Sequence, residues 1–286
     1  DNNANVYTMA KALVYARTGI ESYRTDVIDA CMDAIGTEAG GESLALGRNL
    51  GAFVIAAELV GLPWAEEMQF RDWLLVVRTN IMTAGRSLIT CHEQRPNNWG
   101  TMAGGSRAAV AVYLQDWDDL ADTAQVFKGY LGDTNSYNSF SFGELWWQAG
   151  TNNPVGVNPT NGTIQGHSVD GVLPEEMRRA TEPDGDPAEF TWPPPYQNYV
   201  YEALQGALLQ GVILNRAGYD VWNWEDQAIL RAFTWKHDVA GYPPVGDDNW
   251  QPFIINYYYD TSFATTNLSR HGKNVAPTCW THQSIP

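Results

Sequence analysis

The chain has 286 residues, of which 44% are hydrophobic and 12% aromatic, and its formal net charge is −16. This charge argues against nucleic acid or an anionic membrane surface as a partner, because binding phosphates needs a basic face. No apolar run approaches the roughly 20 residues that span a bilayer, so no membrane anchor is expected.

Helical periodicity dominates the first half of the chain. The spacing of apolar residues predicts helices over residues 6–17, 23–35, 44–60, 66–83, 101–114 and 118–131. Residues 132–195 are rich in Gly, Asn, Ser, Thr and Pro and predict long loops, with a short helical stretch at 142–148. The helical pattern returns at 196–217 and 224–239, and residues 241–286 are again loop-like.

Paired helices without β-type alternation predict an all-α fold, an (α/α) toroid or barrel of antiparallel helix pairs. Length alone permits about two domains, but helical barrels of this size often form one unit. We therefore expect a single domain over residues 1–286. Loops as long as those at 132–195 are usually functional in a compact protein, so they are expected to border the active site.

Several features favour a secreted protein. Two acceptor tripeptides for glycosylation begin at Asn161 and Asn267, and the N-terminus lacks signal-peptide character, so any signal has been removed. Three cysteines, Cys31, Cys91 and Cys279, have no metal-type spacing and predict one disulfide and one free thiol, with the pair left open. We expect a monomeric extracellular glycoprotein that needs no cofactor and binds no metal. Its aromatic content also suits carbohydrate binding, although most aromatic side chains should line the core.

Four segments concentrate polar residues beside helix ends: residues 95–100, 165–179, 196–199, and 271–274 together with 280–282. Each also has a simpler interpretation. Asn97 and Asn98 fit turn and N-cap chemistry, and a lone His167 is more often a structural hydrogen-bonding residue. The segment at 196–199 can be an aromatic helix start, and the last segment can be a tail packed on the body.

Other enzyme classes leave little trace. The sequence contains no nucleophile elbow, P-loop, dinucleotide fingerprint or His-Glu-x-x-His zinc motif. Acidic pairs, Asp116 with Asp118 and Asp119, and Asp184 with Asp186, would suit a calcium site or a glycoside hydrolase. Acidic surface loops explain these pairs more simply.

Taken together, the polar segments resemble the alginate lyase-like superfamily, the helical-barrel lyases of polysaccharide lyase families 5 and 38. The resemblance covers the helical phase and three ordered motifs: Asn97-Asn98-Trp99, the stretch with Asp170, Gly171, Pro174, Glu176 and Arg179, and Tyr196-Gln197-Asn198-Tyr199. Family 5 has His where this chain has Trp99. This difference and a longer insertion before Tyr196 place the chain closer to family 38 or to a divergent branch.

The resemblance implies β-elimination at a uronic acid. Donors aimed at the substrate carboxylate stabilise the intermediate, and Asn98, His167 and Arg179 are assigned to catalysis with Tyr196. A phenol has a pKa of about 10, so Tyr196 needs a nearby positive charge, for which Arg179 is the natural source. Substrate binding is assigned to Asn97, Trp99, Arg178, Tyr199, Lys273 and His282. Tyr199 and His167 are the alternative bases.

The resemblance predicts cleavage of a β-1,4-linked polyuronate, with glucuronan and mannuronate-rich alginate as candidates. These sugars differ at C2 and not at the reacting carbons, so the motifs do not separate them. The net charge opposes long-range attraction of a polyanion but permits a locally basic cleft, for which the available cations are Arg86, Arg95, Arg107, Arg178, Arg179, Arg270 and Lys273. The alternatives are an α/α-barrel glycoside hydrolase with two essential carboxylates and a polysaccharide-binding protein without turnover.

Overall fold

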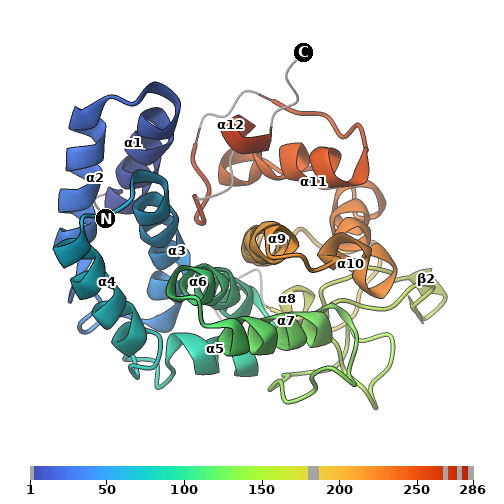
Figure 1. Ribbon diagram of the computed structural model, residues 1–286. Coiled ribbons are helices and arrows are strands. Elements are labelled where there is room, and N and C mark those ends of the chain that lie inside the picture. Colours follow the sequence, from blue (N-terminus) through green and yellow to red (C-terminus); the bar gives the residue numbers. More distant parts are fainter. Residues whose placement is uncertain (1–2, 180–186, 267–269, 276–278, 283–286) are drawn as a thin grey trace.

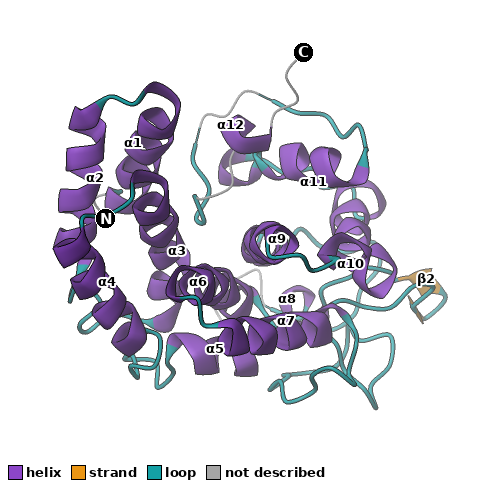
Figure 2. Cartoon of the chain, viewed as in Figure 1, coloured by secondary structure: helices purple, strands orange, loops and turns teal. Residues whose placement is uncertain are grey.

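The computed structural model describes residues 3–179, 187–266, 270–275 and 279–282, with only the backbone of residues 279 and 280. The all-α prediction is confirmed. In the described part of the chain, regular structure other than helix is limited to one short antiparallel hairpin of β1 (Thr163–Ile164) and β2 (His167–Ser168) (Figure 2).

The helices occur in two groups. The first group is α1 (Ala4–Thr18), α2 (Glu21–Ala34), α3 (Ser43–Val60), α4 (Trp64–Val77), α5 (Leu88–Gln94), α6 (Asn98–Leu114) and α7 (Trp117–Leu131). After the long loop come α8 (Pro174–Met177), α9 (Tyr199–Arg216), α10 (Trp224–Thr234), α11 (Gln251–Tyr259) and α12 (Cys279–His282). Short 3-10 turns lie at Val221–Asn223 and Gly246–Asp248, and a π-helical turn at Trp235–Val239 extends α10.

Helix α6 is the centre of the packing, with α3 on one side and α9 on the other (Figure 1). Two glycines allow the close approach. A Cβ on Gly47 of α3 would lie 2.8 Å from the backbone nitrogen of Ala103, and one on Gly206 of α9 would lie 2.4 Å from that of Met102. Side chains at these positions would push the helices apart.

The three central helices run parallel to one another. Along α6 and α9 the contacts advance in the same direction, from Asn98 with Glu202 to Thr101 with Gln210. Along α3 and α6, Gly47 meets Ala103 and the next turn of α3 meets the next turn of α6. The expected antiparallel arrangement therefore does not apply to these helices, which are not consecutive in sequence. Their N-termini lie at one end of the molecule and their C-termini at the other.

Helix α6 also joins two hydrophobic cores. One core contains buried residues of α1, α2, α3, α4 and α6, and the other contains buried residues of α6, α7, α9, α10 and α11. Trp147, Trp235 and Trp250 are among the largest fully buried side chains, as expected for aromatic residues that line a core. The central helices are thereby held firmly on both sides.

Several sequence predictions of local structure were wrong. The structure ends α4 at Val77 instead of residue 83, adds α5 and α11, and has turns instead of helix over 142–148. Helix α11 was missed because its first turn carries Pro252 and its last carries three consecutive tyrosines, which hide the apolar period. Proline is tolerated in the first turn because the N–H groups there have no partner within the helix.

The predicted disulfide was also wrong. Cys31 and Cys91 are both free thiols and both buried, so neither pairs with Cys279, whose side chain lies outside the described residues. Burial raises the pKa of Cys31 to about 12. The glycosylation tripeptide at Asn267 likewise falls outside the described residues, whereas Asn161 is exposed.

Among the described residues, one helix, α3, has the length and composition of a membrane span, and 56% of that apolar window is buried inside the structure. The core helix of a globular protein has the same properties.

Candidate active site

The N-terminal ends of α6 and α9 meet, and most of the polar residues singled out in the sequence lie at this junction. Asn97 precedes α6 and caps it, since its Oδ1 accepts the backbone N–H of Trp99 at 3.1 Å. Asn97 is also buried. Its amide therefore caps the helix, in agreement with the simpler interpretation of this segment, and its expected role in substrate binding stays a prediction.

Asn98, the first residue of α6, is hydrogen bonded on both sides of its amide. Its Oδ1 accepts from Arg179 Nη1 at 2.9 Å, and its Nδ2 donates to Glu202 Oε2 at 3.1 Å. Its backbone N–H donates to Glu176 Oε1. Only 1% of Asn98 is exposed, so in this arrangement its amide positions Arg179.

Arg179 stands between Asn98 and Tyr199. Its Nη1 also donates to Glu176 Oε2 at 3.2 Å, and its guanidinium lies over the Tyr199 ring, 3.7 Å from the ring centre. Gln197 holds the backbone of both partners, because its Nε2 donates to the Arg179 carbonyl and its Oε1 accepts the Tyr199 N–H. The Arg179 side chain is 25% exposed and thus accessible to a ligand. Burial raises the pKa of Glu176 to about 7 against the opposing effect of Arg179.

A second group of charges is built on Glu202, one turn further along α9. Its carboxylate accepts from Arg48 Nη2 of α3 at 2.8 Å and from the ammonium of Lys273. Arg48 and Glu202 were missed by the sequence analysis. Neither lies in a motif, and the signal that could have found Glu202 is its position three residues after Tyr199, on the same helical face.

Tyr196 does not lie against Arg179. Its ring meets Tyr242 edge-on at 5.3 Å, and the buried ammonium of Lys236 lies 4.9 Å from its ring centre. Burial, Asp248 and Asp247 raise the pKa of Tyr196 above its ordinary value, and Lys273 opposes them. The predicted activation of Tyr196 by Arg179 is therefore wrong. The residue that receives this guanidinium is Tyr199, the first residue of α9.

His167 lies away from this group of residues. It belongs to β2, and its ring stacks on Trp192 at 4.5 Å and approaches Phe190 at 6.4 Å. The hairpin lies at the edge of the molecule, apart from α6 and α9 (Figure 1). The structure thus gives His167 aromatic packing partners and does not bring it to Asn98 or Arg179.

Two cations of the same stretch of sequence have different surroundings. Arg178 pairs with Glu144 at 2.6 Å and with Glu175, which ties the loop at residues 143–144 to α8. This pairing gives Arg178 a structural role, and its expected role in substrate binding stays a prediction. Trp99 packs on the α1–α4 core and receives the Arg95 guanidinium 5.4 Å from its ring centre.

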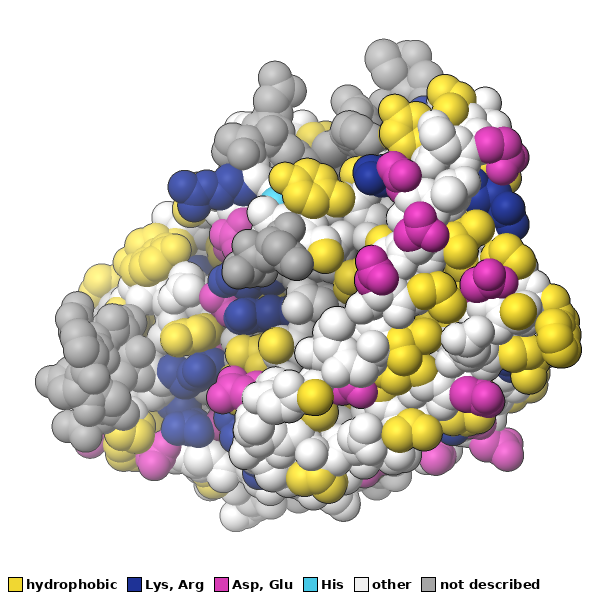
Figure 3. Space-filling model, turned by 90° about the vertical axis from the view of Figure 1, so that its left-hand side faces the viewer, with side chains coloured by type: hydrophobic (Ala, Val, Ile, Leu, Met, Phe, Trp, Pro, Cys, Tyr) yellow, Lys and Arg dark blue, Asp and Glu magenta, His cyan; other side chains and the backbone are white. Residues whose placement is uncertain are grey.

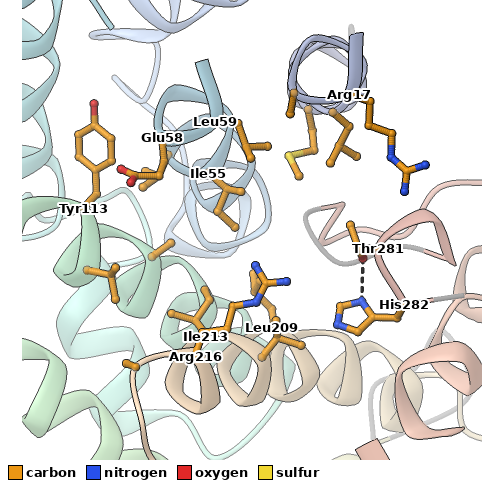
Figure 4. Close-up of a pocket in the computed structure, with 18 of the residues that line it drawn as sticks. Arg17, Ile55, Glu58, Leu59, Tyr113, Leu209, Ile213, Arg216, Thr281 and His282 are labelled. Carbon is orange, nitrogen blue, oxygen red and sulfur yellow. Dashed lines mark hydrogen bonds between the residues drawn. The ribbon is translucent and has the colours of Figure 1, made fainter. Parts of the chain in front are cut away.

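A cavity lies at the opposite, C-terminal ends of the central helices. Its volume is about 620 Å³, and apolar side chains of α1, α3, α6 and α9 line most of it (Figure 4). His282 is buried beside this cavity, hydrogen bonded to Thr281 at 2.7 Å and packed against Tyr257. His282 therefore lies at the other end of the central helices from Asn98, and the structure does not bring these two residues together. An apolar cavity also suits a polyuronate poorly.

Positive charge gathers at the polar end. Burial lowers the pKa of Arg95, and the nearby charges of Arg86 and Arg179 lower it further, which shows that these three cations are close. Lys and Arg side chains form a band on one face of the molecule (Figure 3). The N-termini of α6 and α9 add partial positive charge. A locally basic site thus exists although the whole chain is acidic.

Two of the acidic residues, Asp116 and Asp119, have structural roles, whereas Asp118 is exposed. Asp116 caps α7 and pairs with Arg78 at 2.7 Å, and Asp119 pairs with the buried Arg107 at 2.7 Å. These ion pairs account for both carboxylates without a catalytic role, and they withdraw Arg107 from the candidate cleft. Asp184 and Asp186 lie outside the described residues.

Residues 11–135 match the family model for alginate lyase. Over this span the chain is similar to alginate lyases. The match indicates a polysaccharide lyase, and the alginate lyase family implies an acidic polysaccharide as the substrate. The matched span includes α3, α6 and Asn98 and ends before Arg179 and Tyr199. No curated protein is similar enough to this chain to match it.

Proposed function

We propose that this alginate lyase-like protein cleaves a β-1,4-linked polyuronate, glucuronan or mannuronate-rich alginate, by β-elimination at the N-terminal ends of α6 and α9. The single observation that carries the proposal is the stacking of the Arg179 guanidinium on Tyr199, 3.7 Å from the ring centre. This contact joins an accessible cation for the substrate carboxylate with a phenol that can move a proton.

In the proposed reaction, Arg179 binds the carboxylate of the reacting sugar and stabilises the negative charge that develops when the C5 proton leaves. Asn98 and Glu176 hold the guanidinium in place and are positioning residues. A fixed charge of this kind needs no reorganisation during the reaction, so it stabilises the transition state more than solvent would.

Tyr199 is the proposed base and acid. In β-mannuronate and β-glucuronate the C5 proton and O4 lie on the same side of the ring, so one phenol can serve both. Tyr199 takes the C5 proton, the C4–C5 double bond forms, the C4–O4 bond breaks, and the proton returns to the departing O4. A cation beside the ring stabilises the phenolate that this transfer requires.

Tyr196 is proposed to bind a neighbouring sugar. It is 48% exposed, and Tyr242 and Lys236 fix its ring from behind. An exposed aromatic face held in one orientation suits stacking against a sugar ring. We further infer that the protein acts as a monomer outside the cell, where such polymers are encountered.

The test is an assay of purified protein on glucuronan, alginate and pectate, following the ultraviolet absorbance of the new conjugated double bond. The expected result is an increase with glucuronan or mannuronate-rich alginate. Release of reducing ends without this absorbance would show hydrolysis instead, and polymer binding without either product would show a binding protein.

A further inference from the structure

Glu202 joins three parts of the chain that are far apart in sequence. Its carboxylate receives Arg48 from α3, Asn98 from α6 and Lys273 from the loop before α12, and it is only 5% exposed. Asn98 bonds to Arg179 through the other side of its amide. Arg48 and Lys273 therefore lie near Arg179, and the Asn98 amide and the Glu202 carboxylate connect them to it.

Arg48 and Lys273 are held mainly by the single buried carboxylate of Glu202 and are only partly covered. Arg48 and Lys273 share one buried carboxylate, and Asp247, itself one-third exposed, adds a longer contact at 3.7 Å from Lys273. Both cations remain accessible, with side chains 28% and 31% exposed. Nη1 of Arg48 has no hydrogen-bond acceptor among the described residues. Donor groups are thus left for an anion.

The loop that carries Lys273 is fixed before any ligand arrives. The backbone N–H groups of Lys273 and Asn274 donate to Gln205 Oε1 at 2.7 and 3.2 Å. The next residue, Val275, is buried against Met9 and Ala52 of α1 and α3. In Figure 1 this loop lies between α3 and α9. A rigid loop presents its ammonium with little loss of conformational freedom on binding.

We propose that Arg48 and Lys273, held by Glu202, bind the carboxylate of the sugar adjacent to the reacting one, so that the enzyme requires two consecutive uronates. This inference rests on the proposed lyase function. A homopolymeric uronate carries a carboxylate on every sugar and fills both positions. A polymer whose uronates alternate with neutral sugars places no carboxylate at Arg48 and Lys273. Because unpaired charged groups make binding of such a polymer unfavourable, the site should favour the homopolymer strongly.

The experiment compares kcat/KM on the polyuronate that gives the fastest absorbance increase with kcat/KM on the same polymer after partial reduction of its carboxyl groups to alcohols. The variants are Arg48→Ala and Lys273→Ala. Lys128→Ala is the matched control. It also removes a single cation, but Lys128 is on α7, where it pairs with Asp133 at 2.9 Å and with none of the residues of the proposed site.

We expect the wild type and Lys128→Ala to prefer the unreduced polymer strongly. Each test variant loses about tenfold in kcat/KM on it, mainly through a higher KM, as for the loss of one charge-assisted hydrogen bond. On the reduced polymer we expect the two test variants and the wild type to have similar kcat/KM. Lys273→Arg, which keeps the charge, restores the preference and guards against loss of folding in Lys273→Ala.

Two results would overturn the inference alone: a wild type that cleaves both polymers equally, or variants that lose kcat equally on both polymers and keep the wild-type preference. The second result would mean that the ion pairs only cross-link α3, α9 and the loop. If no polyuronate yields an unsaturated product, the proposed function and this inference fail together.

Discussion

The replacement Arg179→Lys tests the geometry of the site, because it keeps the charge and removes the planar fork. Lysine cannot bond to Asn98 and lie flat on Tyr199 at the same time. The charge-assisted hydrogen bond of 2.9 Å to Asn98 is worth about 1.5–3 kcal/mol, and the stacking at 3.7 Å about 1–2 kcal/mol. A lysine that keeps part of one contact loses about 3 kcal/mol, on the order of a hundredfold in kcat/KM.

The assay measures initial rates of double-bond formation over a range of substrate concentrations. The neighbouring replacement Arg178→Lys is the control, because Arg178 pairs with Glu144 and Glu175 and not with the proposed catalytic residues. We expect it to change the melting temperature more than kcat/KM. A rate for Arg179→Lys within about threefold of wild type, or equal losses in both variants, would refute the assigned geometry.

Three further predictions concern the surroundings of the site. The pKa of Glu176 is about 7 and its carboxylate anchors the site, so kcat/KM should fall as the pH drops through about 7. The replacement Glu176→Gln should remove this pH dependence. The control is Asp248→Asn, which removes another carboxyl with a pKa of about 7 and should keep the dependence. The free energy of unfolding should depend on pH in the opposite direction. The Glu176 carboxyl has a higher pKa in the folded protein than its ordinary value of 4.5, so its contribution to stability is present below pH 4.5 and is lost as the pH rises through about 7. Urea unfolding at several pH values measures this change. The replacement Gly206→Ala places a Cβ 2.4 Å from the α6 backbone and should lower the free energy of unfolding by about 1–3 kcal/mol. The control Gly150→Ala places its Cβ in open space and should lower it far less. Equal melting temperatures of the two variants would contradict the close packing of α6 and α9. Burial raises the pKa of Cys31 to about 12, so its thiol should react with a thiol reagent only after unfolding, and rapid labelling of the native protein would show that the described packing is wrong.

The sequence predicted the helical fold well where the apolar period was regular. The expected helix over 44–60 matches α3 within one residue, because Gly61 and Pro63 end it sharply. The prediction was weaker where tertiary contacts decide the structure. Nothing in the local pattern of α11 distinguishes it from an aromatic loop, and in the structure it packs against α9 and α12.

The candidate site was predicted in part. The motifs identified Asn98, Arg179 and Tyr199, which the structure brings into contact, but not which tyrosine receives the cation. That choice depends on where α9 begins, and helix ends are harder to predict than helix interiors. Three partners of Glu202 lie more than 70 residues away from it in the sequence, so only the folded structure reveals these contacts.

The proton-transfer role of Tyr199 is tested by comparing kcat and polymer affinity for Tyr199→Phe and Tyr196→Phe on the preferred polyuronate. We predict that Tyr199→Phe abolishes turnover and leaves binding nearly unchanged, because it removes only the hydroxyl that carries the proton. Tyr196→Phe keeps kcat and raises KM modestly. Near-normal turnover by Tyr199→Phe together with an inactive Tyr196→Phe would contradict the account and assign the proton transfer to Tyr196.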